Sequence, residues 1–356
     1  MAKKILGFGN PVMDMMATVG DDTLAEWGAK LNDAILAEEK HEPLYAKLAA
    51  EKQIDYVAGG ATLNTIRVAQ WCMTAAGSAN SSGYIGCIGK DAFGEKMKSA
   101  LVADGVKNLF LEVDSAPTGT CAVLVKDAER SLVTKLGAAE SYDPAHFESA
   151  PVQALLNESE VFYMAGYPIT HAGGASTVKK IAEHALASNK TLCMNLSAPF
   201  LAMVPPFRET LLDVFQYCNY IFMNESEAGE LAKQLGWDCA GKGSAAIAAE
   251  IAKLPSKRGG LKAVVTQGAL CTVLAETGKE AVTYEVKGNP WTLTQDMLTD
   301  TNGAGDAFCG GFIAKLAAGA SDAECAKMGH FAAGTIIQQS GCTIPAYDKV
   351  SAVLSK

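Results

Sequence analysis

The chain has 356 residues, of which 49% are hydrophobic and 19% charged, and this composition excludes an intrinsically disordered protein. At ~150 residues per domain, the length predicts two domains with a sizeable core. Thirty basic residues against 39 acidic ones give a net charge of −9, which is the wrong sign for a general nucleic-acid or anionic-lipid surface.

The ten cysteines stand fifteen or more positions apart, so the sequence contains no CxxC pair of the kind found in zinc sites. No apolar run approaches the ~18 to 20 residues that span a bilayer, and MAKKILGFGN does not read as a secretory leader. We therefore expect free thiols, a cytoplasmic protein, and no nucleic-acid or membrane partner.

Strand-like and helix-like segments alternate along most of the chain, a pattern typical of parallel strands joined by helical crossovers. Strands are predicted at residues 3–9, 82–89, 161–165, 191–196, 220–223 and 263–266. Helices are predicted at residues 60–72, 93–104, 176–188, 207–215 and 225–235, then at 304–318 and 323–339, the last two ended by Gly319 and Gly341. The predicted fold class is α/β, with a doubly wound, mainly parallel sheet and helices on both faces.

Two stretches break this alternation and predict a small α/β lid. Residues 15–58 include an acidic, helix-prone segment, and residues 118–136 read as a hairpin around a DAER turn. We expect the lid to comprise residues 15–58 and 115–138, and the large domain to comprise residues 1–14, 59–114 and 139–356. Such a cover is a common means of excluding water from a cleft.

The segment DTNGAGDAF at residues 300–308 carries the clearest chemical signal. Gly303, Ala304 and Gly305 open a helix whose unpaired amides and positive dipole end favour a phosphate. Asp306 stands in its first turn, where it is placed to accept a proton from a substrate hydroxyl aimed at that phosphate. A helix cap is the alternative interpretation of Asp306, but a cap alone does not require the glycines.

A second glycine segment, AGGATLN at residues 58–64, also precedes a predicted helix. Paired glycines allow close backbone approach to a ligand, and the Asn64 amide carries both a donor and an acceptor suited to sugar hydroxyls. Taken alone, Gly-Gly before a helix is more often a simple loop, and Asp14, in the segment after the first strand, is equally typical of a turn.

Three further candidates have strong alternatives. Glu227, in NESE after a strand, is suited to ordering Mg²⁺ through water or to capping its helix. Arg130 in the lid turn can reach phosphate oxygens or remain solvated. His330 and Phe331 form a pair that can bracket a nucleobase or pack in the core.

Taken together, these segments resemble the ribokinase-like (pfkB) carbohydrate kinases and, among them, the adenosine kinases. DTNGAGDAFCGGF and AGGATLNTIRVA match the two family signatures, and GNPVMD, GCIGKDAFGE, PTGTCAVLV, NLSAPF, NESEAGE and GCTIP follow in the family's order. The resemblance implies ATP-dependent phosphorylation of the 5′-hydroxyl of adenosine to AMP in purine salvage, with Mg²⁺ accompanying ATP, by a protein that is expected to be a monomer.

The resemblance also implies residue roles. Asp306 matches the catalytic base, Gly303, Ala304 and Gly305 the anion hole, and Arg130 the lid arginine near the phosphates. Substrate contacts are implied for Asn10, Asp14, Gly59, Gly60, Ala61, Asn64, Tyr167 and Phe200. ATP or magnesium contacts are implied for Asn195, Asn224, Glu227, Thr266, Gly268, Asn302 and His330.

The sequence departs from this family pattern around the base. Adenosine kinases commonly carry glutamine at the position of Ala34, serine and glutamine at those of Ala61 and Leu63, and two phenylalanines at those of Tyr167 and Pro168. Loss of an aromatic ring reduces stacking on a purine by ~0.5 to 1.5 kcal/mol. A kinase for another ribonucleoside or sugar, and a silent nucleoside-binding regulator, therefore remain alternatives. A nicotinamide dehydrogenase is disfavoured because GFGNP is not GxGxxG.

Overall fold

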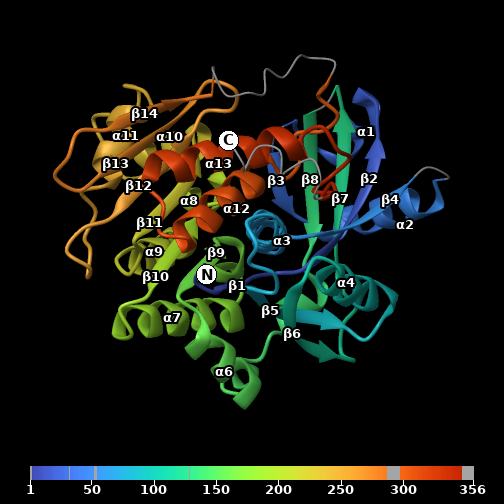
Figure 1. Cartoon of the computed structure of the whole chain (residues 1–356). Helices are drawn as coiled ribbons and strands as arrows, with labels where there is room; N and C mark the ends of the chain where they lie inside the picture. Colours follow the sequence, from blue (N-terminus) through green and yellow to red (C-terminus); the bar gives the residue numbers. More distant parts are fainter. Residues whose placement is uncertain (1, 32, 52–53, 128, 287–296, 347–356) are drawn as a thin grey trace.

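The computed structural model describes residues 2–31, 33–51, 54–127, 129–286 and 297–346, and these build two sheets (Figure 1). The larger sheet has nine strands in the order β14-β13-β12-β11-β10-β9-β1-β5-β6, parallel except for the antiparallel β12–β13 and β13–β14 pairs. In that order the strands are Val282–Glu285, Cys271–Glu276, Lys262–Thr266, Tyr220–Asn224, Thr191–Asn195, Val161–Ala165, Ile5–Phe8, Ser82–Gly89 and Val106–Val113.

Two hydrophobic cores cover the two faces of this sheet. In β9, Val161 and Tyr163 belong to one core, whereas Phe162 and Met164 belong to the other, as the two-residue period of a strand requires. The first core includes α3 (Ala61–Ala75), α4 (Ala92–Ala103), α12 (Ala304–Ala317) and α13 (Asp322–Ile336). The second includes α5 (Pro144–Phe147), α6 (Ala150–Glu158), α7 (Ala172–Ala187), α8 (Pro199–Met203), α9 (Pro205–Phe215), α10 (Glu225–Gln234) and α11 (Ser244–Ile251).

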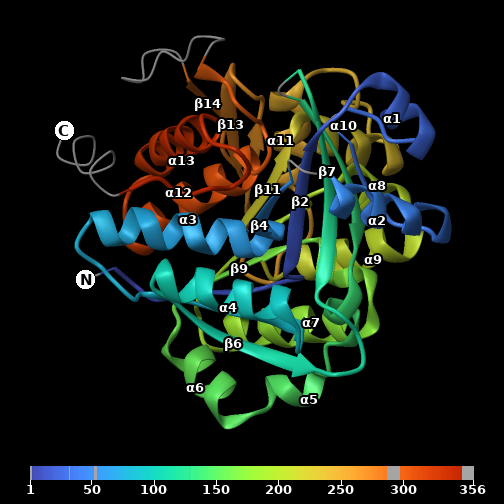
Figure 2. The ribbon, with the colours of Figure 1, turned by 90° about the vertical axis from the view of Figure 1, so that its right-hand side faces the viewer.

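A second, five-stranded sheet, here called the small sheet, has the order β3-β8-β7-β2-β4. Its strands are Asp33–Leu36, Glu129–Lys135, Gly119–Lys126, Val12–Thr18 and Asp55–Gly59. Met15, Leu44 and Leu124 lie in the core that joins one face to α1 (Asp21–Trp27) and α2 (Glu42–Ala50). The 90° rotation in Figure 2 shows this sheet rising beside the N-terminal end of α3, away from α6 and α7.

The predicted fold class is confirmed, and the six predicted strands of the large sheet lie within two residues of their observed bounds, whereas the parallel edge strand β6 was not predicted. The small sheet starts at Val12, so the boundary predicted at residue 15 falls inside β2. The predicted C-terminal helix ends at Ile336, before Gly341, whose backbone N–H donates to Asp300 Oδ2 at 3.0 Å. Gly319, with φ of 79°, follows α12 as expected.

All ten cysteines are free thiols, nine of them buried. In the ranges that the structure describes, no helix is both long and apolar enough to cross a membrane. The same ranges contain no group of three histidine, cysteine or acidic side chains that could hold a metal ion.

Candidate active site

A cavity of about 1010 Å³ is lined jointly by the small sheet, the carboxyl ends of β10–β12 and the N-terminus of α12. All predicted site residues except Gly59 line it. They are Asn10, Asp14, Gly60, Ala61, Asn64, Arg130, Tyr167, Asn195, Phe200, Asn224, Glu227, Thr266, Gly268, Asn302, Gly303, Ala304, Gly305, Asp306 and His330. Segments from both ends of the chain therefore meet at one site.

The loop before α12 is shaped to present backbone at this cavity. Gly303 is the N-cap with φ of 75°, a left-handed conformation that favours glycine, and a Cβ there would lie 3.0 Å from Cys342. A Cβ on Gly305 would meet open space. The Ala304 amide donates to Thr301 O at 3.3 Å and the Ala307 amide to Gly303 O at 2.8 Å, so the amides of Gly305 and Asp306 are the ones placed for an anion.

Asp306 projects from the first turn of α12 and is held by Asn64, whose Nδ2 donates to Asp306 Oδ2 at 3.0 Å. Burial raises the pKa of Asp306 to about 6, although the Asn64 hydrogen bond and the Arg130 charge both act to lower it. At neutral pH the carboxylate is still mostly ionised and able to accept a proton. Oδ1 of Asn64 is buried without a partner among the described residues.

Asp14 lies on β2 at the same cavity and is 5% exposed. Burial, together with repulsion from Asp306, raises its pKa to about 7. Asn302 Nδ2 faces Asp14 Oδ2 at 3.4 Å. A Cβ on Gly59 would lie 2.4 Å from this carboxyl group, so Gly59 serves the site by making room for Asp14 rather than by lining the cavity.

Arg130 bridges the small sheet to the loop before α12. Its Nε donates to Asn302 Oδ1 and its guanidinium NH1 to Thr301 Oγ1, both at 3.2 Å. This places a cation beside the N-terminus of α12, where phosphate charge is expected.

Asn224 and Glu227 form a reciprocal capping box at the start of α10. Asn224 Oδ1 accepts from the Glu227 amide at 2.8 Å, and the Asn224 amide N–H donates to Glu227 Oε2 at 3.0 Å. Asn224 Nδ2 also donates to Glu227 Oε1 at 2.9 Å. Burial raises the pKa of Glu227 to about 7 despite these bonds. The capping alternative is therefore realised. The Ser197 backbone also bonds this carboxyl group, and because a carboxylate can accept about four hydrogen bonds, it can still accept one from the water ligand of a metal ion.

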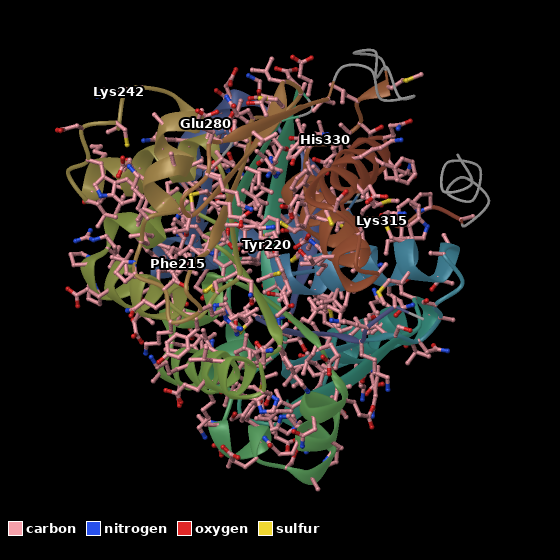
Figure 3. The ribbon with its side chains drawn as sticks, turned by 60° about the vertical axis from the view of Figure 1, so that its left-hand side comes forward. Phe215, Tyr220, Lys242, Glu280, Lys315 and His330 are labelled. Carbon is pink, nitrogen blue, oxygen red and sulfur yellow. The ribbon has the colours of Figure 1, made fainter. Side chains whose placement is uncertain are left out.

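Another part of the cavity lining is formed by Thr266, Gly268 and His330. Thr266 ends β12 and Gly268 follows it in a turn with φ of 53°. His330 projects from α13 (Figure 3), with Nε2 2.8 Å from Thr272 Oγ1 and its ring 5.5 Å from that of Phe308. Burial lowers the pKa of His330 to about 4, so the imidazole is neutral at pH 7.

Several residues lie outside the places that the sequence suggested. Phe331 stacks in the core on Trp71, with ring centroids 6.0 Å apart, and leaves His330 alone at the cavity. Of the departures around the base, Ala34, Ala61 and Tyr167 line the cavity, whereas Leu63 and Pro168 are buried without lining it.

The aromatic end of the cavity is formed by Tyr167 and Phe200, whose ring centroids lie 6.4 Å apart at 39°. The Tyr167 hydroxyl donates to Ser197 O at 3.0 Å, which fixes the ring. Asn195, at the end of β10, donates from Nδ2 to Cys309 Sγ at 3.6 Å and accepts from the Ser197 amide at 3.0 Å.

Sequence reasoning missed the contributions of the small sheet to the lining, namely Ile35, Leu36, Leu132, Thr134 and Leu136 with Val12 and Cys121. The two-residue alternation within the strands was the available signal, because their other faces supply the core with α1 and α2. It also missed His171, whose Nε2 lies 3.1 Å from Asn10 Oδ1.

The comparisons with known proteins agree with this site. Residues 21–349 match the model of the pfkB family carbohydrate kinases. The chain is 42% identical to Adenosine kinase 2 of Arabidopsis thaliana over 96% of its own length and 95% of that protein, and 37% identical to the Dictyostelium discoideum adenosine kinase over 96% and 97%.

Solved structures give the same result. The Anopheles gambiae adenosine kinase in complex with P1,P4-di(adenosine-5) tetraphosphate superposes with a TM-score of 0.88 at 36% identity, covering 96% of this chain and 98% of that one. The Schistosoma mansoni adenosine kinase in complex with 2-fluoroadenosine gives 0.90 at 33% identity, covering 98% and 99%. The resemblance noted from the motifs is confirmed, and the chain belongs to the pfkB family of carbohydrate kinases, with adenosine kinases as its relatives there.

Proposed function

We propose that this protein transfers the γ-phosphoryl group of ATP to the 5′-hydroxyl of adenosine, giving AMP and ADP. The relatives at 37 to 42% identity are adenosine kinases, and the neighbouring structures are adenosine kinases with nucleoside or dinucleotide ligands. The observation that carries the proposal is the meeting, in one cavity, of a half-buried carboxylate, Asp306, with the glycine-opened N-terminus of its own helix.

Asp14, Asn64 and the backbone of Gly60 would anchor the ribose. Carboxylate and amide oxygens accept hydrogen bonds from sugar hydroxyls, and Gly60, with φ of 107°, brings backbone to the cavity without a Cβ. Tyr167 and Phe200 offer ring faces for the purine at the far end. This arrangement would leave the 5′-hydroxyl directed at Asp306.

Asp306 then accepts the hydroxyl proton as the bond from O5′ to the γ-phosphorus forms and the bond to the β-phosphate oxygen breaks. A carboxylate of pKa about 6 suffices because phosphoryl transfer depends mainly on alignment and charge neutralisation. The amides of Gly305 and Asp306 and the Arg130 guanidinium would stabilise the equatorial phosphate oxygens.

We also propose that ATP enters with Mg²⁺. The described lining carries five carboxylates, from Asp14, Glu129, Glu225, Glu227 and Asp306, against the cationic Arg130, which disfavours the free tetra-anion. Bound with the nucleotide, Mg²⁺ supplies charge neutralisation. Glu227 would hold its water ligands, because both oxygens of that side chain are already fixed by Asn224.

The small sheet with α1 and α2 would act as the lid. The predicted bounds, 15–58 and 115–138, cover this unit except for residues 12–14 at the start of β2 and Gly59 at the end of β4, and the remainder would form the large domain. On closure, Arg130 and the apolar side chains that line the cavity, Ile35, Leu36, Leu132 and Leu136, would exclude water. We further propose a monomeric, cytoplasmic protein; the ten unpaired thiols support a reducing compartment.

The test is a coupled assay of ADP production across adenosine, inosine, guanosine, cytidine and ribose with MgATP. We expect kcat/KM for adenosine to exceed that for every other acceptor by ~10²-fold or more, because the cavity combines ribose anchors with ring faces. A higher value for another acceptor would assign another substrate. Nucleoside binding without ADP production would assign a regulator instead.

A further inference from the structure

His171 joins the candidate substrate site to the start of a helix on the opposite side of the large sheet. It follows the short turn η3 (Tyr167–Thr170) and is the N-cap of α7. Its Nδ1 accepts a hydrogen bond from the Gly174 amide at 3.1 Å, and its Nε2 lies 3.1 Å from Asn10 Oδ1. Asn10 is 161 positions away in the chain and lines the cavity.

The bond from Gly174 decides the tautomer of the imidazole. A backbone N–H can only donate, so Nδ1 must carry the lone pair, and in the neutral ring the proton then resides on Nε2. Burial lowers the pKa of His171 to about 4, which keeps the ring neutral at physiological pH. His171 therefore donates to Asn10 from Nε2.

This donation fixes which way round the Asn10 amide lies. A donor requires an acceptor opposite it, so Oδ1 and not Nδ2 faces His171. Asn10 is only 8% exposed, and its Nδ2 group is buried without a hydrogen-bond partner among the described residues. A buried NH₂ group without an acceptor is costly, so the site favours a ligand that supplies one.

We propose that His171 is a positioning residue for substrate: through Nε2 it holds the Asn10 amide with its NH₂ group available to an acceptor atom of the nucleoside. The acceptor is a ribose oxygen or a ring nitrogen, both of which a ribonucleoside offers near Asp14. This inference rests on the proposed function. It adds a residue that neither lines the cavity nor touches substrate, yet sets the hydrogen-bonding polarity of one that does.

Two substitutions separate this role from helix capping. In His171→Asn the side chain still supplies an N-cap acceptor at the position of Nδ1, but it is too short to reach Asn10. In His171→Gln the terminal amide reaches as far as Nε2 and can donate to Asn10, but glutamine is a poor N-cap. One variant keeps the cap and the other keeps the donor.

We expect His171→Asn to raise the KM for adenosine ~10-fold, with kcat within about twofold and an unchanged melting temperature. We expect His171→Gln to keep the KM for adenosine within about threefold of wild type while its melting temperature falls by a few degrees. In an Asn10→Ala background, His171→Asn is expected to have no further effect on KM.

A wild-type KM in His171→Asn would overturn the proposal. So would a rise in KM that follows the loss of melting temperature in both variants, since capping alone would then explain it. The same series is measured by calorimetric binding of adenosine without ATP. A wild-type protein that binds adenosine but makes no ADP would refute the proposed function, while the binding data would still test His171.

Discussion

Asn64 and Asp306, 242 positions apart in the chain, share a hydrogen bond of 3.0 Å between Nδ2 and Oδ2. The bond links the first turn of α3 to the first turn of α12, and these two helices pack closely. A Cβ on Gly310 of α12 would lie 2.7 Å from Thr65 O of α3, so glycine permits the approach. The two glycine segments of the sequence therefore form one site. Among the residues that the structure describes, Asp306 Oδ2 accepts the Asn64 bond, and Oδ1 has no hydrogen-bond donor, so it can take a substrate proton.

Replacement of Asp306 by asparagine removes the proton acceptor while keeping its shape. We expect kcat to fall by ~10²-fold or more and the melting temperature to change little. Asp322→Asn is the matched control, since Asp322 also stands in the first helical turn, of α13, but pairs with Lys262 and Tyr220 away from the cavity. Equal losses of turnover in the two variants would remove Asp306 from the mechanism.

The pH dependence of turnover reports the buried carboxylates. The pKa of Asp306 is raised to about 6, and those of Asp14 and Glu227 to about 7, so all three gain protons as the pH falls from 8 to 5. We expect kcat/KM to decline over that range with an apparent pKa that belongs to the coupled set. A rate that stays constant from pH 8 to pH 5 would show that no carboxylate with a raised pKa takes part.

Asp14→Asn is expected to stabilise the protein while weakening substrate binding. Because the folded-state pKa of about 7 exceeds the ordinary aspartate value of ~3.9, the folded chain binds the proton more tightly than the unfolded one. Ionised Asp14 therefore lowers the free energy of unfolding. This destabilisation is absent below pH ~4, grows between pH 4 and pH 7, and is complete above pH 7. Asparagine removes it.

Thermal melts at two pH values test whether Asp14→Asn stabilises the protein. We expect Asp14→Asn to gain on the order of 2 kcal/mol at pH 8 and nothing at pH 4, with KM for adenosine raised ~10²-fold. A variant that is less stable than wild type at pH 8 would contradict the assignment of a strained, buried carboxylate at residue 14.

Arg130 is expected to act through its forked guanidinium rather than through charge alone. Arg130→Lys retains the charge but cannot contact Asn302 and Thr301 together, so we expect kcat to fall ~10-fold, and by more in Arg130→Ala. Lys135→Ala on the same strand, which removes an exposed ion pair with Glu42, serves as the control and should retain turnover. Full activity in Arg130→Ala would show that Arg130 has no role in catalysis.

Glu227→Gln tests the metal site separately from the helix cap. Glutamine at this position still allows a capping box, but it has no negative charge for metal-bound water. We expect the Mg²⁺ concentration for half-maximal activity to rise ~10-fold, with a small change in melting temperature. Glu324→Gln alters the equivalent capping box of α13 and should leave the Mg²⁺ response as in wild type. An identical response in both variants would exclude Glu227 from holding the metal.

The sequence allowed most of the large sheet to be predicted, because its strands are short apolar runs between turn residues. Ser82–Gly89 and Val161–Ala165 have the predicted bounds. The Met-rich β2 was not predicted, since both its faces are buried and no alternation marks it. β14 was also missed, because three of its four positions are exposed and its apolar pattern is weak. β13 was missed although its four central positions are buried.

The candidate site was predictable where chemistry is encoded locally and not where it depends on distant contacts. The glycines of the loop before Asp306 stand next to that residue in the chain, so the local sequence is enough to predict the geometry of the loop. The contact between His171 and Asn10 spans 161 positions with no shared motif, and only the fold brings the two together. Leu63 shows the converse, since a position inside a family motif points into the core.

Asp14 belongs to the small sheet, whereas Asp306 belongs to a helix packed on the large one. The group that would bind the sugar and the group that would accept its proton are therefore held by two different sheets. We therefore expect a substitution far from either carboxylate to reduce turnover if it changes how the two sheets pack, because it would change the distance between Asp14 and Asp306.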